Sequence, residues 1–263
     1  MGGINHQPTS NISLALTVDA AQSLTEGMSN LMRSNVEIEN VVKLTGSNRI
    51  GNGRLHLKQS LLFMRASLND LELVHDGVNL IIETLSRGDY SPFSPSIINV
   101  DEFVSRAQKE SMLPKSDVVI CAREDCIKGG YEAMFSHIIE MIDSAILSTN
   151  SLINLTNTMI DGPEGKQGYF WFTVETNKKP WRQIFSHTVT MWQDLLSYWM
   201  TSALICTEVH NKGANIPSLF ENISNFLDFP KYDFNRLSRK KDIQKLKSSF
   251  NRDITYSISR DIK

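Results

Sequence analysis

The feature that most constrains the fold of this chain is an apolar repeat at helical spacing in residues 61–85. Its positions step alternately by three and four residues: Leu61, Met64, Leu68, Leu71, His75, Val78, Ile82 and Leu85. Such spacing lines one face of an α-helix and is typical of helices that pack side by side. We expect this helix to begin near Gly53 and to end before Gly88, where a residue without a Cβ suits a helix terminus. His75, the one polar member, is expected to be satisfied by a neighbour and to set the register of packing.

Three further segments show the same periodicity. The first ends near Gly46, where a loop at residues 45–53 follows. The second covers residues 131–160, and the third begins at Pro180 and continues to about His210. Their stripes contain Leu24, Met28, Leu31, Ile38 and Val42; Met134, Ile138, Met141, Ala145, Leu152 and Leu155; and Trp181, Ile184, Thr188, Trp192, Leu195, Trp199 and Ala203. Helices of about 30 residues bury such stripes most easily side by side. The sequence therefore predicts a mainly α fold, a bundle of about four long antiparallel helices.

Shorter elements are expected around the bundle. Three prolines mark residues 88–119 as a connection that holds one helix at about 101–112, with Asp101 as its N-cap. Short helices are also expected at 218–227 and 234–250. Apolar or alternating runs at 118–121, 169–176 and 254–258 are typical of strands. These runs either form a small sheet at one end of the bundle or are loops.

Composition fits one helical domain over residues 1–263 in a reducing compartment. Of the 263 residues 41% are apolar, and the three cysteines are too few for a disulfide framework. No apolar run approaches the length that a bilayer requires, so we expect a cytoplasmic protein without a transmembrane segment. Residues 1–10 are polar, almost uncharged and expected to be frayed. Their composition also occurs in non-cleaved export signals of bacterial effectors and toxins.

One pair of residues suggests a catalytic site. Arg182 and His187 are separated by four residues at the start of a predicted helix. This spacing resembles the R-x4-6-H motif of the HEPN superfamily, helical domains that include metal-independent ribonucleases. The resemblance covers six residues, and Gln183 is a loose match for the residue that usually follows the arginine. It implies that Arg182 stabilises phosphate charge and that His187 is a general acid/base.

Cysteine and histidine spacing suggests a metal site, which we weigh against simple burial. Cys121 and Cys126 lie five residues apart, and Cys206 and His210 lie one turn apart on a predicted helix. Together they could form a Cys3His zinc site. The two pairs lie far apart in the sequence, and free cysteines commonly pack as small apolar residues. We therefore predict no metal and no cofactor.

The last 29 residues carry a strong positive charge. Residues 235–263 contain nine lysines and arginines against three aspartates, whereas residues 1–234 carry a net charge of −8. The basic residues expected to bind a partner are Arg239, Lys240, Lys241, Lys245 and Lys247. A basic amphipathic segment binds nucleic acid, an anionic membrane or an acidic protein, or docks on the acidic body of its own molecule. Phe170, Trp171 and Phe172 are candidate contact residues if they are exposed.

The sequence also argues against the commonest motif-bearing enzyme classes, without excluding enzymes in general. It contains no Walker A loop, no dinucleotide-binding glycine motif, no nucleophile elbow and no zinc-protease motif. We therefore expect a non-enzymatic helical interaction protein that binds a protein partner or a second copy of itself, with a bacterial effector or toxin as one version. The alternative is a ribonuclease of the HEPN kind in a toxin or antiviral-defence system.

Overall fold

The computed structural model describes residues 7–86, 95–160 and 167–214. All of them belong to the first of two units into which the chain divides, Met1–Ile216. The long helices are α1 (Gln7–Lys43), α2 (Ile50–Ser86), α4 (Asp117–Ile160) and α5 (Gln167–Ala214); a 3-10 turn, η1 (Pro95–Ile97), and the short α3 (Val100–Lys109) lie between α2 and α4. The described ranges contain no strand. The predicted mainly α fold is confirmed.

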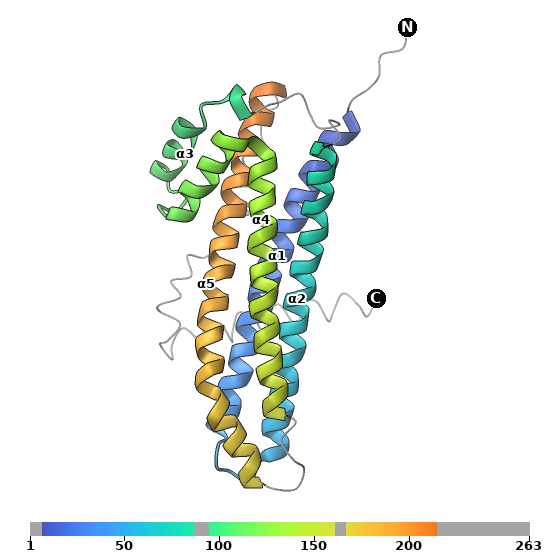
Figure 1. Ribbon diagram of the computed structural model, residues 1–263, viewed down its shortest axis with the longest axis vertical. Coiled ribbons are helices and arrows are strands. Elements are labelled where there is room, and N and C mark those ends of the chain that lie inside the picture. Colours follow the sequence, from blue (N-terminus) through green and yellow to red (C-terminus); the bar gives the residue numbers. More distant parts are fainter. Residues whose placement is uncertain (1–6, 87–94, 161–166, 215–263) are drawn as a thin grey trace, which may run out of the picture. The chain divides into compact units, whose positions relative to one another are not determined.

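The four long helices form a bundle in which successive helices run in opposite directions (Figure 1). Helix α1 packs against α2 and α5, and α4 packs against the same two helices. Each long helix therefore has two neighbours and one outward face. The turn between α1 and α2 contains Gly46 at φ +78°, a left-handed conformation that glycine adopts without steric cost.

The buried stripe of α2 is shifted by one residue at three of the predicted positions, Leu68, His75 and Ile82, which are only half-buried. The stripe contains Leu57, Ser60, Leu61, Met64, Ser67, Leu71, Val74, Val78 and Ile81. Ser60 occupies it where α1 approaches α2 closely, since Ser60 Oγ donates a hydrogen bond to the backbone oxygen of Ser34 on α1, at 3.0 Å. A pattern search that counts apolar residues passes over such positions. Close helix approach, rather than apolar content, selects them.

His75 is satisfied by neighbours, as predicted, although it lies beside the buried stripe rather than in it. It is half-buried, and its Nδ1 lies 3.1 Å from Nδ2 of Asn79. Its Nε2 lies 3.4 Å from a carboxylate oxygen of Asp143 on α4. The residue is therefore satisfied by neighbours from its own helix and from the next one.

Two predicted strands within the described ranges are wrong, and so is one helix start. Residues 118–121 form the first turn of α4, and residues 169–176 form the beginning of α5. Pro180 lies inside α5 rather than at its start. The aromatic run is helical because burial overrides the β-propensity of its residues. Phe170, Trp171 and Val174, at helical spacing, are all buried.

Helix α4 consists of two helical arms joined at Gly130. This residue has φ +66° and ψ −151°, which are not helical values. The predicted helix start at Tyr131 therefore marks the second arm, whereas the first arm was not predicted as a helix. The N-cap of α3 is Asn99, whose Oδ1 accepts from the backbone N–H of Glu102 at 3.2 Å. Asp101, the predicted cap, instead forms an ion pair with Arg123 on α4, in which Oδ1 lies 3.3 Å from Nε.

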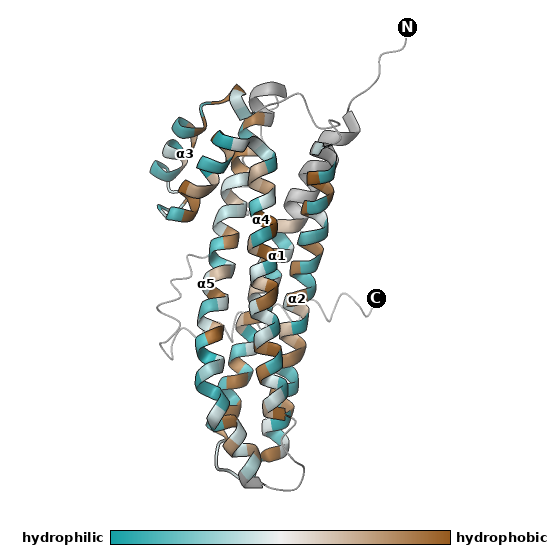
Figure 2. Ribbon diagram, viewed as in Figure 1, coloured by the Kyte–Doolittle hydropathy of each residue, from teal (hydrophilic) through white to brown (hydrophobic). Residues whose placement is uncertain are grey.

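Polar and apolar residues alternate along each long helix (Figure 2). Within the described ranges, no helix is apolar over a length that could cross a membrane. The predicted elements at 218–227, 234–250 and 254–258 lie outside the described residues, as do residues 1–6 of the N-terminal segment. The predicted connection at 88–119 ends at residue 116, because α4 begins at Asp117.

Candidate functional site

A cluster of four polar side chains joins the first arm of α4 to the rest of the bundle. Asp125 lies on the first arm, His137 on the second and Tyr198 on α5. Asp125 Oδ2 accepts a hydrogen bond from the Tyr198 hydroxyl at 2.6 Å and lies 2.8 Å from Nδ1 of His137. Cys121, one turn before Asp125, places its Sγ 3.6 Å from the same oxygen and 3.8 Å from the same nitrogen. The reversal at Gly130 brings these groups together.

The cluster is electrostatically centred on an ionised carboxylate. Burial would raise the pKa of Asp125, but hydrogen bonds from Tyr198 and His137 outweigh burial and lower the pKa below its ordinary value. Burial raises the pKa of the Tyr198 hydroxyl, and its hydrogen bond to Asp125 and the negative charge of Asp125 raise this pKa further. Burial also raises the pKa of the Cys121 thiol, followed by the charge of Asp125 and then by the hydrogen bond to it. At neutral pH the phenol and the thiol therefore hold their protons beside a charged Asp125.

The geometry does not fit a Cys–His–Asp catalytic relay. Such a relay uses both ring nitrogens of the histidine, one toward the nucleophile and the other toward the carboxylate. Here Nδ1 of His137 faces both Cys121 and Asp125. The thiol is also not activated, since its pKa is raised. What the cluster offers is one sulfur, one nitrogen and one oxygen within 4.8 Å of one another, a set typical of metal ligands.

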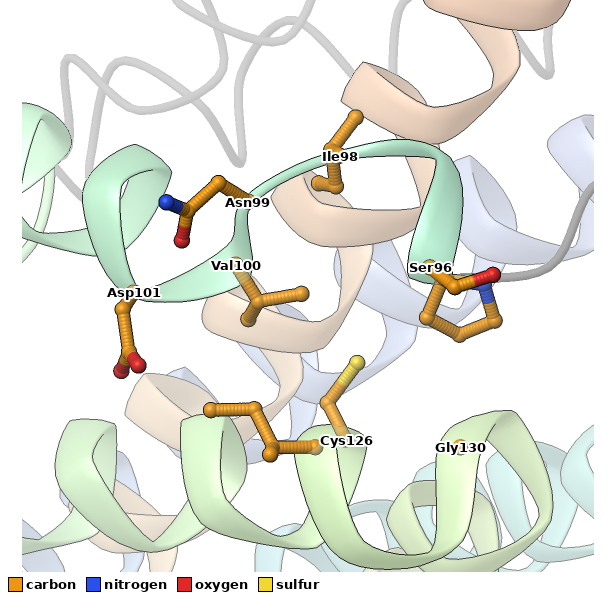
Figure 3. A pocket seen from close by; sticks show the side chains of 9 residues that line it. Ser96, Ile98, Asn99, Val100, Asp101, Cys126 and Gly130 are labelled. Atoms are coloured by element: carbon orange, nitrogen blue, oxygen red, sulfur yellow. The ribbon is translucent and has the colours of Figure 1, made fainter.

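A hollow of about 420 Å³ lies beside the first arm of α4, between it and the segment that leads from η1 into α3. Figure 3 shows the sulfur of Cys126 directed into it, below Val100. Burial raises the pKa of the Cys126 thiol to about 11, so this sulfur is a poor nucleophile at neutral pH. Among the described residues of the wall, Asp101 alone is charged, and it pairs with Arg123. These described residues do not form the convergent polar groups of an active site.

The four residues of the zinc hypothesis do not form one cluster where the structure describes them. Cys121 contacts Asp125 and His137, whereas Cys126 lines the hollow. Burial raises the pKa of the Cys206 thiol, and the second cause is the negative charge of a Cys126 thiolate. Cys206 therefore lies near Cys126. The side chain of His210 lies outside the described residues.

Arg182 and His187 both lie on the surface of α5. Arg182 forms a bidentate pair with Glu39 of α1: its Nε lies 2.8 Å and its Nη2 2.7 Å from the two carboxylate oxygens. Nothing in the described part of the chain joins His187 to Arg182 by a hydrogen bond or an ion pair. Residues five apart on one helix also diverge by about 140°. The ribonuclease hypothesis stays a prediction with no supporting contact.

Of the three aromatic candidates, only Phe172 meets the condition of exposure. Its exposed fraction is 65%, and its ring lies 6.4 Å from that of Tyr169. Phe170 and Trp171 are buried, and Trp171 Nε1 donates to the backbone oxygen of Ser47 at 2.9 Å. These two side chains therefore fix the turn between α1 and α2 against α5. The basic candidates Arg239, Lys240, Lys241, Lys245 and Lys247 lie outside the described residues.

The outward face of α2 carries a surface that the sequence analysis missed. Leu55, Leu62, Leu73 and Leu80 are between 50% and 65% exposed. At about 100° per residue, all four project within about 20° of one line, and the line is about 37 Å long. We call these four residues the leucine stripe. The spacing of these leucines, seven, eleven and seven residues, is present in the sequence. That they face outward is known only once the structure shows which face of α2 is buried.

Charged side chains flank the leucine stripe in two blocks. Lys58 and Arg65 are exposed beside its first half, and Glu72, Asp76 and Glu83 are exposed beside its second half. All five project on the same flank of α2, about 60–100° from the leucines. The stripe therefore combines an apolar centre with a charged rim, which is the composition of an interaction surface.

Comparison of the chain with protein-family models, with curated proteins and with solved structures finds no match.

Proposed function

We propose that this chain is a non-enzymatic interaction protein that pairs with a second copy of itself through the outward face of α2. The observation that carries the proposal is the leucine stripe. Single exposed leucines are ordinary, but four in one line along 37 Å of helix, estimated at about 1.5 Å per residue, are typical of a surface that another helix covers.

The arrangement of the stripe favours a second copy as the partner. Its spacing is the same when it is read in either direction, seven, eleven and seven residues. When two copies of α2 lie antiparallel across a twofold axis, Leu55 therefore meets Leu80 of the second copy, and Leu62 meets Leu73. A twofold interface requires this kind of self-complementarity, because the same patch is used by both copies.

The charges fit the same antiparallel arrangement. A twofold axis at the middle of the stripe keeps the charged flanks of the two helices on the same side. Lys58 then lies opposite Asp76 of the second copy, and Arg65 lies opposite Glu72. In a parallel arrangement the twofold axis runs along the helices and places the two charged flanks on opposite sides, so none of these pairs between opposite charges forms. Apolar spacing and charge order thus support one orientation independently of each other.

The first test is the oligomeric state of the full chain by light scattering and sedimentation over a range of concentrations. We expect a dimer for the wild type and a monomer for the double variant Leu62→Glu/Leu73→Glu. Each leucine contributes about 1.5–3 kcal/mol when it is fully buried, and each substitution occurs twice in a twofold dimer. The control is Leu147→Glu, which alters a 70% exposed leucine on α4. It should leave the dimer intact.

The charge order gives a sharper test at the same surface. Lys58→Glu alone and Asp76→Lys alone should each weaken the dimer, by about 0.5–1 kcal/mol for each of the two symmetric pairs. The double variant exchanges the two charges and should restore the wild-type dimer. A wild type that stays monomeric at all concentrations contradicts self-pairing. If a different protein then binds the wild type but not the leucine variant, the stripe serves that partner instead.

A further inference from the structure

We propose that Cys121, Asp125 and His137 bind a divalent transition-metal ion, with Zn²⁺ as the ion that the donor set fits best. This inference is independent of the proposed pairing through α2. It rests on a cluster that the sequence hypothesis of a Cys3His site did not contain, since only Cys121 is shared. The donors are one thiol, one carboxylate and one imidazole, all of which zinc sites in proteins use.

The distances between the donor atoms approach those of a tetrahedral zinc site. With ordinary zinc–ligand bond lengths, sulfur lies about 3.5 Å from a nitrogen or oxygen ligand, and nitrogen lies about 3.3 Å from oxygen. In the structure, Cys121 Sγ lies 3.8 Å from His137 Nδ1 and 3.6 Å from Asp125 Oδ2. The nitrogen and the oxygen are 2.8 Å apart, so only this edge must open, by about half an ångström.

The donors converge on one point and are held there by a further residue. Buried Tyr198 donates its hydroxyl hydrogen bond to Asp125, and its ring packs on the His137 ring with centroids 4.8 Å apart. One side chain thus orients two of the three ligands, as second-sphere groups do in metal sites. The side chains of His137 and Asp125 are 35% and 27% exposed, so an ion can enter from solvent. The fourth position is then open to water.

Binding requires a defined movement of protons. Zinc takes the thiolate form of Cys121, so the thiol proton is released to solvent. His137 must offer the lone pair of Nδ1, so its remaining proton resides on Nε2. The ion then replaces the hydrogen bond between His137 and Asp125 and links the first arm of α4 to the second. Metal binding would therefore stabilise the arm that Gly130 allows to fold back.

The experiment is a titration of the reduced, metal-free full chain with Co²⁺, which reports both geometry and thiolate ligation by absorption. We expect the visible bands of a tetrahedral site and a near-ultraviolet thiolate charge-transfer band, both saturating at one equivalent and both displaced by Zn²⁺. Cys121→Ser should abolish the charge-transfer band. Cys126→Ser and Cys206→Ser are matched controls and should retain it. Tyr198→Phe, which keeps the ring and removes the hydroxyl, should weaken binding by about 10–100-fold.

A second readout does not depend on colour. One equivalent of Zn²⁺ should raise the Tm of the wild type and of Cys126→Ser, and leave the Tm of Cys121→Ser unchanged. The proposal is overturned if no thiolate band forms at one equivalent, or if the band persists in Cys121→Ser. Loss of the band in Cys126→Ser or Cys206→Ser, with the fold intact by circular dichroism, would assign the metal to those cysteines and equally overturn it.

Discussion

Gly27 and Gly77 both lie inside long helices, but only Gly27 faces another side chain across the bundle. A Cβ at position 27 would overlap the ring of Trp192 on α5 and lie 3.0 Å from Cβ of Asp70 on α2. A Cβ at position 77 meets nothing within 4 Å. At the scale of single residues, the packing of α1 against α5 therefore depends on the absence of a side chain at Gly27, which makes room for the Trp192 ring.

These two glycines give a matched prediction for stability. Alanine in place of glycine favours a helix by about 1 kcal/mol, whereas overpacking a core costs about 1–3 kcal/mol. We expect Gly27→Ala to lower the free energy of unfolding in urea and Gly77→Ala to raise it by about 0.5–1 kcal/mol. Equal effects of the two substitutions would show that Trp192 moves aside at no cost.

At the scale of elements, the fold-back of α4 depends on one residue. The φ of +66° and ψ of −151° at Gly130 lie in a region that glycine alone adopts readily, and strain of this kind costs about 1–3 kcal/mol in other residues. The first arm carries Cys121 and Asp125, so the polar cluster exists only if this reversal forms.

Gly130→Ala should therefore release the first arm of α4 while the bundle stays folded. We expect faster amide hydrogen exchange in residues 117–129 and unchanged protection in residues 131–160. Gly46→Ala is the control, since it strains another positive-φ glycine, in the turn between α1 and α2. It should leave exchange in the first arm unchanged. Loss of protection throughout the bundle in Gly130→Ala would mean that the arm and the bundle unfold as one unit.

At the scale of the whole molecule, the orientation of the proposed dimer can be fixed by cross-linking. In an antiparallel pair, residue 62 of one copy meets residue 73 of the other, while the two residues 62 are about 16 Å apart along the helix axis. A disulfide needs Cα atoms within about 7 Å. Leu62→Cys alone and Leu73→Cys alone should therefore not cross-link, and a mixture of the two variants should. A cross-link in Leu62→Cys alone would indicate a parallel pair.

The sequence predicted the bundle because helical periodicity is a local property. The stripes on α1, α4 and α5 agree with the buried faces at most positions, because large apolar residues dominate them, as Trp181, Trp192 and Trp199 do on α5. Val42, Met141, Leu155, Ile184 and Ala203 are only half-buried. The stripe of α2 was displaced at three positions, where Ser67, Val74 and Ile81 are buried in place of Leu68, His75 and Ile82. The aromatic run at 169–176 was assigned to a strand for a similar reason, since the burial of Phe170 and Trp171 against Gly53 in the first turn of α2 is a tertiary contact.

The polar cluster could be predicted from the sequence only in part. Cys121 and Asp125 are one helical turn apart, but the prediction of a strand at 118–121 concealed this spacing. His137 and Tyr198 are 61 positions apart in the sequence, and no local pattern joins them. Their meeting depends on the packing of α4 against α5, and the reversal at Gly130 then adds Cys121 and Asp125.

By itself, then, the sequence determined that this chain forms long helices and which residues most of them bury, because both follow from the 3.6-residue repeat. Tertiary structure decided which small residues enter the core and which donor atoms converge at Asp125. It also decided that four leucines of α2 face outward. Each of these depends on the side chains that a neighbouring helix presents, and a helix has an outward face only once its neighbours cover the others.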